Sequence, residues 1–224
     1  MGQKKKGKYR KMKEQMPGKA ENIDENKRMR LIESAMDEFA THGYQKANTN
    51  EIAKKAGVSK GLLFHYFGSK KELYIYLYDY AMGLFIEALF SELNWEEKDI
   101  FKCWRAGAEL KFGMMREHGK LFEFILAAYV NPAEELQNEL DTKMMNWVIS
   151  SWNQLLMNID VSKFKEGIDV EKAVQTIRWA IDGFSRERIT PNKTLKDYLD
   201  NYDALLLELD QYLSFLKKLL YRDE

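Results

Sequence analysis

The chain has 224 residues, of which 45% are hydrophobic, and its 35 basic residues balance 35 acidic ones. This length suffices for a small domain and a larger one, each with a hydrophobic core. A single cysteine, Cys103, excludes an internal disulfide and fits a reducing cytoplasm, and no run of about eighteen apolar residues predicts a membrane span.

Residues 1–22 form a lysine-rich segment without a periodic apolar pattern. This composition is typical of a disordered arm. Such an arm can follow the minor groove of DNA, as the N-terminal arms of other DNA-binding proteins do. A solvated tail or a vector-derived leader is the alternative. The segment has no apolar core, so we do not interpret it as a secretory signal.

A helix is predicted next, at the start of a domain over residues 23–71. Its apolar residues recur at steps of three and four, which gives one stripe along the helix: Ile32, Ala35, Met36 and Phe39. Gly43 is expected to end this helix, because glycine adopts left-handed backbone without steric cost, and Tyr44 to pack back on it. Three short helices do not complete a core alone, so we expect support from a helix that begins near Lys70.

Residues 49–67 predict two short helices joined by a tight turn. Gly57 follows good helix formers and is the expected stop of the first helix. Ser59 is a strong N-cap residue for the second helix, and Thr49 is expected to cap the first. The inward positions fit two crossing helices: Ile52, Ala53, Ala56, Val58 and Leu63. This is the helix-turn-helix arrangement that places a helix in the DNA major groove, and a plain helical hairpin is the alternative.

The same stretch resembles the tetracycline-repressor (TetR) family of transcriptional regulators. The resemblance covers about residues 27–80. Beyond the positions above, it is carried by Lys60-Gly61, Phe64-His65-Tyr66-Phe67, Ser69-Lys70 and Glu72-Leu73. Phe64 stands where the family often has tyrosine, so one hydroxyl contact to DNA would be missing. The resemblance implies an all-α fold, with an N-terminal three-helix helix-turn-helix DNA-binding domain and a C-terminal helical ligand-binding and dimerisation domain over residues 72–224.

The second helix of the motif is expected to lie in the major groove, with its early residues near base edges. Leu63 and Phe67 are its inward residues, so His65 and Tyr66 should point outward, where the resemblance implies phosphate and base-edge contacts. Leu62 is a candidate for contact with a thymine methyl group. The full predicted DNA-binding set is Thr49, Ser59, Lys60, Gly61, Leu62, Phe64, His65, Tyr66 and Lys70. Most of these contacts would position the protein rather than specify sequence.

Gly61 is unexpected so early in a helix, because glycine there costs roughly 1 kcal/mol of helix propensity relative to alanine. A phosphate or base that approaches the backbone closely would explain it. A tight contact with the first helix of the motif would explain it equally well, and both interpretations stay open.

The zero net charge is the sum of two regions of opposite sign. Residues 1–71 hold 17 Lys and Arg against 8 Asp and Glu, a net charge of +9, and residues 72–224 hold 18 against 27, a net charge of −9. A basic N-terminal third suits phosphate binding. The acidic remainder argues against a second nucleic-acid surface.

Nearly everything after residue 70 predicts helix, with about six helices and no persistent strand pattern. Breaks are expected at Asn94-Trp95, His118-Gly119, Asn131-Pro132, residues 160–167 and residues 190–193. The last two helices carry apolar seams suited to shallow helix–helix packing. The resemblance implies that they build a homodimer as a four-helix bundle, to which we assign Ile177, Ile181, Phe184, Leu206, Leu209, Leu213, Leu216 and Leu220. A dimer would place two recognition helices roughly 34 Å apart on a near-palindromic operator.

The middle of the chain is rich in aromatic residues and methionine, which supply broad and adaptable apolar walls. The resemblance implies that a small apolar or amphipathic effector binds here and, by spreading the two DNA-binding domains, releases the operator. The candidate pocket residues are Trp104, Phe112, Phe124, Trp147, Trp152 and Trp179. Ordinary core packing is the alternative for each of them.

The chemistry of enzymes and metal sites is not visible in the sequence. His42, His65 and His118 are not spaced with cysteines or carboxylates as metal ligands would be, and no phosphate-cradling glycine loop or nucleophile elbow occurs. We therefore expect no metal, no cofactor and no enzymatic activity. The sequence predicts a cytoplasmic transcriptional regulator. We expect it to be a repressor that binds a double-stranded DNA operator and is released from it by an effector of unknown identity. The alternatives are a DNA-binding regulator without an effector and a helical ligand-binding protein with a vestigial DNA motif.

Overall fold

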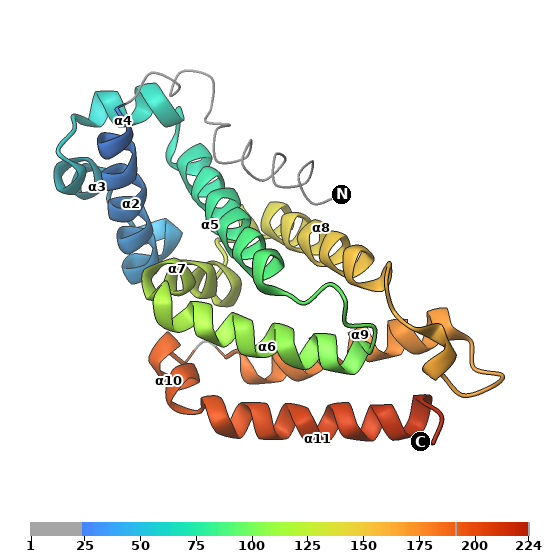
Figure 1. The fold of residues 1–224 in the computed structure, drawn as a ribbon. Coiled ribbons are helices and arrows are strands. Elements are labelled where there is room, and N and C mark those ends of the chain that lie inside the picture. The colour runs from blue at the N-terminus through green and yellow to red at the C-terminus, as the bar shows by residue number, and fades with distance from the viewer. Residues whose placement is uncertain (1–23, 191, 224) are drawn as a thin grey trace. The chain divides into compact units, whose positions relative to one another are not determined.

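The computed structural model of the chain describes residues 24–190 and 192–223, apart from the side chains of Ser151, Trp152, Gln154 and Leu155. Ten α-helices and one short 3-10 helix make up this part of the chain, and the predicted all-α class is confirmed (Figure 1). The predicted arm at residues 1–22 lies outside the described residues. The helices are α2 (Glu25–Lys46), α3 (Thr49–Ala56), α4 (Lys60–Phe67), α5 (Lys70–Glu92), α6 (Ile100–Glu117), α7 (Gly119–Val130), α8 (Gln137–Leu156), η2 (Val161–Lys163), α9 (Val170–Arg188), α10 (Leu195–Asp200) and α11 (Tyr202–Leu220).

The described chain forms two compact units. Unit 1 comprises residues 24–91 and 118–141, and unit 2 comprises residues 92–117 and 142–223. The helix-turn-helix segment therefore shares a unit with α5 and α7. The functional boundary expected after residue 71 does not coincide with this division and stays a prediction.

The first helix of unit 1 has the apolar stripe that its sequence predicts. The inward residues of α2 are almost inaccessible: Leu31, Ile32, Ala35, Met36 and Phe39. Gly43 interrupts the helix with a φ of 68°, which confirms it as the stop, and Tyr44 stacks on Phe39 with ring centroids 6.2 Å apart. Tyr74 of α5 fills the space between two other rings, 4.9 Å from Phe39 and 5.3 Å from Phe124 of α7. Three helices distant in sequence thus share one aromatic core.

Helix α5 is the expected support for the DNA-binding helices. Its buried side chains, Leu73, Tyr74, Tyr76, Leu77, Tyr78, Ala81, Met82 and Ile86, belong to unit 1. By length and composition α5 would also pass as a membrane span, against our expectation from the sequence. A core helix has the same composition, because it is apolar on more than one side. The contact of Tyr74 with rings of α2 and α7 accounts for the apolar character of α5.

Unit 2 is built around a core shared by α6, α9 and α11. Its buried members are Ile100, Phe101, Phe164, Ala173, Val174, Ile177, Ile181, Leu206, Leu209, Leu213, Leu216 and Tyr221. The structure has breaks between helices at each of the positions that the sequence predicts, and it has one more. A further break at Asn201 separates α10 from α11, so the described chain has one helix more after residue 70 than the approximate number expected. Thr194 and Asp197 form a capping box at the start of α10, a local signal that could have revealed this helix.

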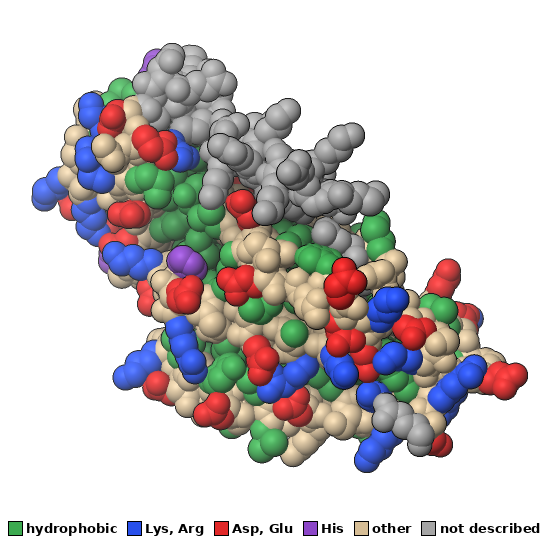
Figure 2. Space-filling view, viewed as in Figure 1, with side chains coloured by type: hydrophobic (Ala, Val, Ile, Leu, Met, Phe, Trp, Pro, Cys, Tyr) green, Lys and Arg blue, Asp and Glu red, His purple; other side chains and the backbone are tan. Residues whose placement is uncertain are grey.

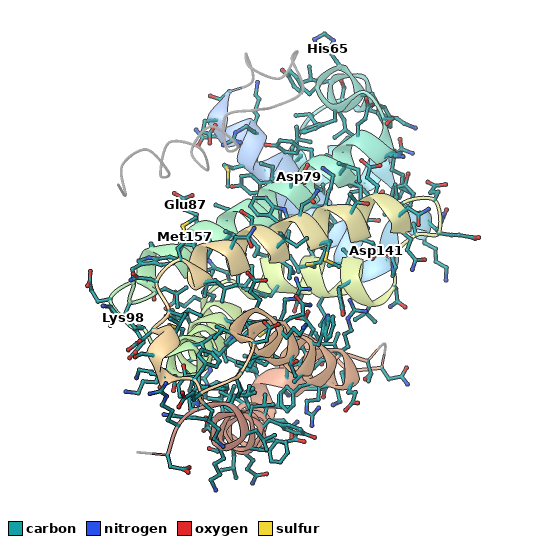
Figure 3. The ribbon with its side chains drawn as sticks, turned by 90° about the vertical axis from the view of Figure 1, so that its right-hand side faces the viewer. His65, Asp79, Glu87, Lys98, Asp141 and Met157 are labelled. Carbon is teal, nitrogen blue, oxygen red and sulfur yellow. The ribbon has the colours of Figure 1, made fainter. Side chains whose placement is uncertain are left out.

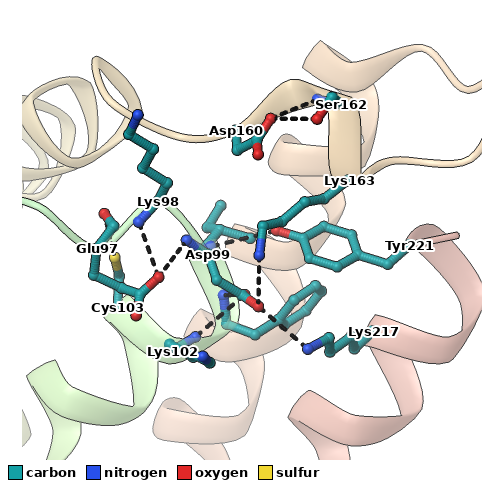
Figure 4. A network of polar contacts seen from close by, with 12 residues as sticks. Glu97, Lys98, Asp99, Lys102, Cys103, Asp160, Ser162, Lys163, Lys217 and Tyr221 are labelled. Atoms are coloured by element: carbon teal, nitrogen blue, oxygen red, sulfur yellow. Dashed lines mark hydrogen bonds and ion pairs between the residues drawn. The ribbon is translucent and has the colours of Figure 1, made fainter. Parts of the chain in front are cut away.

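A polar network closes one end of unit 2 (Figure 4). Asp99 is almost inaccessible at 1% and pairs with Lys217 at 3.2 Å and Lys163 at 3.8 Å. The hydroxyl of Tyr221 accepts the backbone N–H of Ile100 at 3.4 Å. The network joins the start of α6, the η2 segment and the end of α11. One buried carboxylate, that of Asp99, thus connects three segments that are far apart in the sequence of unit 2.

Candidate DNA-binding site and effector region

The turn of the helix-turn-helix motif has the geometry that its sequence predicts. Gly57 has φ 70° and ψ 36°, in the left-handed region, and its N–H donates to the carbonyls of Ala53 and Lys54. The Ser59 hydroxyl accepts the N–H of Leu62 at 3.1 Å and so caps α4. Both predictions are confirmed. Glycine is needed at this turn because a side chain at that φ is strained.

The N-cap of α3 differs from the prediction. Asn48, not Thr49, caps the helix, because its side-chain oxygen accepts the N–H of Asn50 at 2.9 Å. Thr49 is the first residue inside α3 and is half-buried. Both residue types are good caps, so composition alone did not decide between neighbours.

Two side chains of α2 hold the two ends of α3, and the sequence analysis missed both. The carboxylate of Glu38, which is only 4% exposed, accepts the backbone N–H of Asn48 at 3.0 Å. Arg30 donates from Nε to the carbonyl of Ala56, the last residue of α3, at 3.2 Å. Lys55 adds an ion pair to Glu38 at 3.5 Å. An acidic residue directly beside Phe39 in the apolar stripe was the available signal for Glu38.

The outward face of α4 carries the predicted DNA contacts. Leu63 and Phe67 are 0% and 1% exposed, so the inward direction is confirmed. His65 is exposed and projects from the edge of unit 1 (Figure 3), and its ring meets that of the half-buried Tyr66 at 5.6 Å. Lys60 is exposed at the start of α4, with its ammonium 5.9 Å from the Phe64 ring. The side of α4 that is turned away from the core therefore presents a cation, an imidazole and a phenol.

Gly61 lies in open surroundings on the same helix. A methyl group added at Gly61 would meet only the Ser59 hydroxyl oxygen, at 3.9 Å, and the residue is exposed. A tight contact with α3 therefore does not explain the glycine. Close approach of a phosphate or base to Gly61 stays a prediction.

Lys70 already has partners within unit 1. Its ammonium donates to the carbonyls of Gln45 at 3.1 Å and Ala47 at 2.7 Å, and lies 5.1 Å from the Tyr44 ring. Burial lowers the pKa of Lys70. These bonds close the connection between α2 and α3, so the expected phosphate contact would compete with them.

Basic side chains stand at the outer edge of unit 1 near α2, α3 and α4, with acidic ones among them (Figure 2). The exposed lysines on these elements include Lys46, Lys54, Lys55 and Lys60. Much of the positive charge counted in residues 1–71 belongs to the first 22 residues, which hold 8 Lys and Arg against 2 Asp and Glu and lie outside the described residues.

Comparisons with known proteins agree with this geometry. The family profile described as "Bacterial regulatory proteins, tetR family" matches residues 31–77. The fatty acid metabolism regulator protein of Bacillus subtilis (strain 168) is 30% identical over 162 residues, which cover 70% of this chain and 80% of that protein.

Solved structures share the fold. A FadR regulator from Bacillus subtilis, solved in complex with stearoyl-CoA, superposes with a TM-score of 0.59 at 22% identity, covering 84% of this chain and 97% of that one. A TetR family regulator from Chloroflexus aurantiacus J-10-fl gives a TM-score of 0.58 at 20% identity, covering 90% of this chain and 96% of that one.

The chain belongs to the tetR family of bacterial regulatory proteins. It is a DNA-binding transcriptional repressor with a ligand-binding domain, and it is not an enzyme. The expected family, fold and regulator class are confirmed.

The residues predicted for the effector pocket of this repressor belong to both units. Phe124 is inaccessible in the aromatic core of unit 1, whereas Trp104 and Phe112 pack against the core of unit 2. Trp147 is half-buried and Trp179 is 64% exposed. The side chain of Trp152 lies outside the described residues.

The surface hollows of the described chain include the following two. One is lined by α11 residues that include Leu207 and Phe215, and the other by the end of α2 and the segment after α7. Neither includes a predicted pocket residue. The pocket assignment therefore stays a prediction for the other candidates, and core packing explains Phe124.

The predicted dimerisation residues of the repressor are buried within a single chain, and their role in a dimer stays a prediction. Ile177, Ile181, Leu206, Leu209, Leu213 and Leu216 are at most 7% exposed within a single chain, and Phe184 and Leu220 pack against the same core. These seams join α9 and α11 to the rest of unit 2. A different set of large apolar side chains on the two helices is exposed, from 47% to 64%: Trp179, Leu207, Tyr212, Phe215 and Leu219. The period of three and four identified buried residues but could not say what buries them.

Proposed function

We propose that this repressor controls genes of fatty-acid metabolism and that a long-chain acyl-CoA thioester releases it from its operator. The observation that carries the proposal is the length of the alignment with one relative. The relative named as a fatty acid metabolism regulator matches over 162 residues, far more than the residues 31–77 covered by the family profile. A match confined to the DNA-binding motif would support DNA binding alone, whereas this one includes much of the effector region.

The chemistry of the proposed effector fits the composition of unit 2. A FadR regulator of the same fold is described in complex with stearoyl-CoA. An acyl chain needs a long apolar wall, and α6 of this chain offers half-buried Trp104, Ala108 and Phe112 on one side of the helix. The proposed site residues are thus those around α6, rather than Phe124.

The proposed DNA face consists of Lys60, Gly61, His65 and Tyr66, with the hydroxyls of Thr49 and Ser59 beside them. Ser59 uses a lone pair in capping, so its O–H remains able to donate to a phosphate. Operator contacts of this kind are strengthened by low salt, because phosphate binding releases counterions.

The proposed homodimer uses the exposed apolar residues of α9 and α11, not their buried seams. Trp179, Leu207, Phe215 and Leu219 are each more than half exposed. Large exposed apolar side chains on neighbouring helices mark interaction surfaces, and two such helices from each of two chains make a four-helix arrangement. A two-fold dimer reads a near-palindromic operator.

The test is operator binding by the purified protein, with DNA fragments from upstream of its own gene and of acyl-CoA-consuming genes, across a salt series. We expect salt-sensitive binding that the double substitution Lys60→Ala/Tyr66→Ala abolishes. Stearoyl-CoA should release the DNA, and CoA without an acyl chain should not. Retention of the DNA at saturating stearoyl-CoA would contradict the proposed effector class while leaving the DNA-binding assignment intact.

A further inference from the structure

One side of α11 carries an open hollow of about 400 Å³. The residues that line it recur at steps of three and four, so they form one stripe along the helix: Leu207, Asp210, Gln211, Ser214, Phe215 and Lys218. The two large apolar members, Leu207 and Phe215, are 63% and 59% exposed. Exposed apolar side chains that border a hollow are typical of a surface that meets another protein.

Two charges of opposite sign stand at equal distances along this stripe. Asp210 precedes Ser214 by four residues and Lys218 follows it by four, which is about 6 Å of helix in each direction. The Asp210 side chain is 45% exposed and accepts from Arg105 through Oδ1, so its second oxygen can accept from another donor. Lys218 is exposed, and among the described residues its ammonium has no ion pair.

A two-fold axis at Ser214 would bring these charges together. Rotation by 180° about an axis perpendicular to the exposed face of α11 lays the α11 of a second copy antiparallel to the first. Asp210 of each copy then faces Lys218 of the other, which gives two symmetrical ion pairs. Ser214 has the smallest side chain of the stripe and stands where the helices cross, and a small side chain there lets two helices approach closely.

We propose that two copies of the repressor pair through α11, antiparallel and centred on Ser214, with ion pairs between Asp210 and Lys218 of opposite copies. This inference rests on the proposed function and deepens it, because it names the contact at the centre of the homodimer. The competing arrangement sets α11 against α9 of the second copy, near Trp179, and puts no axis at Ser214. Opposite charges at equal steps from one small residue favour the pairing of α11 with itself.

Disulfide formation in the full chain tests which residues meet at the axis. Ser214→Cys places two thiols within reach of each other if the helices cross there, whereas the two thiols of Leu207→Cys would be about 21 Å apart along the helices. We expect oxidised Ser214→Cys to run as a covalent dimer on a non-reducing gel and Leu207→Cys, the matched control, to run as a single chain. The natural Cys103 is buried, so it should not contribute.

Charge substitutions test the ion pairs by sedimentation. Asp210→Lys sets lysine against lysine and Lys218→Asp sets aspartate against aspartate, so each variant alone should dimerise at least about tenfold more weakly than the wild type. Mixed in equal amounts, the two variants should form a heterodimer, because each facing pair is again of opposite sign. Mixing would not repair damage within one chain. Glu109→Lys is the control, since it also places a lysine beside Arg105 but lies outside the hollow, and it should dimerise normally.

A wild-type dimer whose Ser214→Cys variant does not cross-link, or charge variants that mixing fails to rescue, would overturn the pairing at Ser214 and spare the proposed homodimer. A wild type that is monomeric at micromolar concentration would overturn the homodimer and its centre together. Operator binding and its release by stearoyl-CoA are measured separately, so their failure would contradict the proposed function without being mistaken for either result.

Discussion

The substitution Gly61→Ala adds one methyl group and should change the free energy of unfolding and the operator affinity in opposite directions. Gly61 is the second residue of α4, has a negative φ and has room for a methyl group, whose nearest neighbour would be the Ser59 oxygen at 3.9 Å. Alanine therefore fits the folded state without strain and restricts the unfolded chain. The free energy of unfolding should rise by about 0.5–1 kcal/mol.

The same methyl group would stand on the proposed DNA face. If a phosphate or base approaches the Gly61 backbone, the added carbon displaces it, and the operator affinity of Gly61→Ala should fall by about tenfold, which corresponds to roughly 1.4 kcal/mol. Urea unfolding measures the first effect and fluorescence anisotropy with labelled operator DNA the second. Gly113→Ala is the matched control, because Gly113 is also an exposed helical glycine with open space, on α6 in unit 2.

Opposite changes in the two measurements would support close approach of DNA to α4. Higher stability with unchanged operator affinity would refute it, since the methyl group would then meet nothing. Lower stability would refute the description of the open space beside Gly61.

Three further predictions concern other parts of the chain. Asp99→Ala should lower the free energy of unfolding by about 3 kcal/mol in urea titrations, because Lys217 and the start of α6 lose a buried partner; an unchanged midpoint would argue against the network. Phe215→Asp should shift the protein from dimer to monomer in sedimentation with little change in far-ultraviolet circular dichroism, whereas substitution of the buried Leu213 should instead unfold it. Burial, together with a bond to Glu135, raises the pKa of Tyr44 to about 12, so folding favours the protonated phenol. The stability that this contributes is complete below about pH 10 and is lost as the pH rises toward 12, so Tyr44→Phe should show a shallower alkaline loss in pH-dependent unfolding.

The helix-turn-helix motif was predictable because its signals are local. Gly57 and Ser59 each act on backbone groups within a few residues, so their roles follow from the sequence alone. The prediction of the N-cap of α3 was wrong for a related reason. Asn48 and Thr49 can both cap a helix, and only the course of the backbone decides which of them does.

The packing partners of the last helices were not predictable in the same way. The spacing of Leu209 and Leu213 shows that one face of α11 is buried, but it contains no information about the burying surface. α6 and α9 of the same chain cover that face, and the residues of α6 are about a hundred positions away from those of α11. The exposed face that carries Leu207 and Phe215 was not identified from the sequence, because only the periodic seam of α11 was considered.

The predicted pocket illustrates a limit of composition. Phe124 and Trp104 belong to different units, although both lie in one aromatic-rich stretch of sequence.

The attachment of α3 at both ends to α2 limits how this repressor can be switched. Glu38 holds the backbone at the first end and Arg30 the carbonyl at the last, so α3 has little freedom to tilt on its own. Any displacement of α2 should carry α3 along as one body, and α4 with it through the short turn. In the proposed dimer, an inducing ligand would then change the distance and angle between the two helix-turn-helix domains and leave the structure of each domain unchanged. Hydrogen exchange should accordingly show α2 and α3 opening in a single step, with or without ligand.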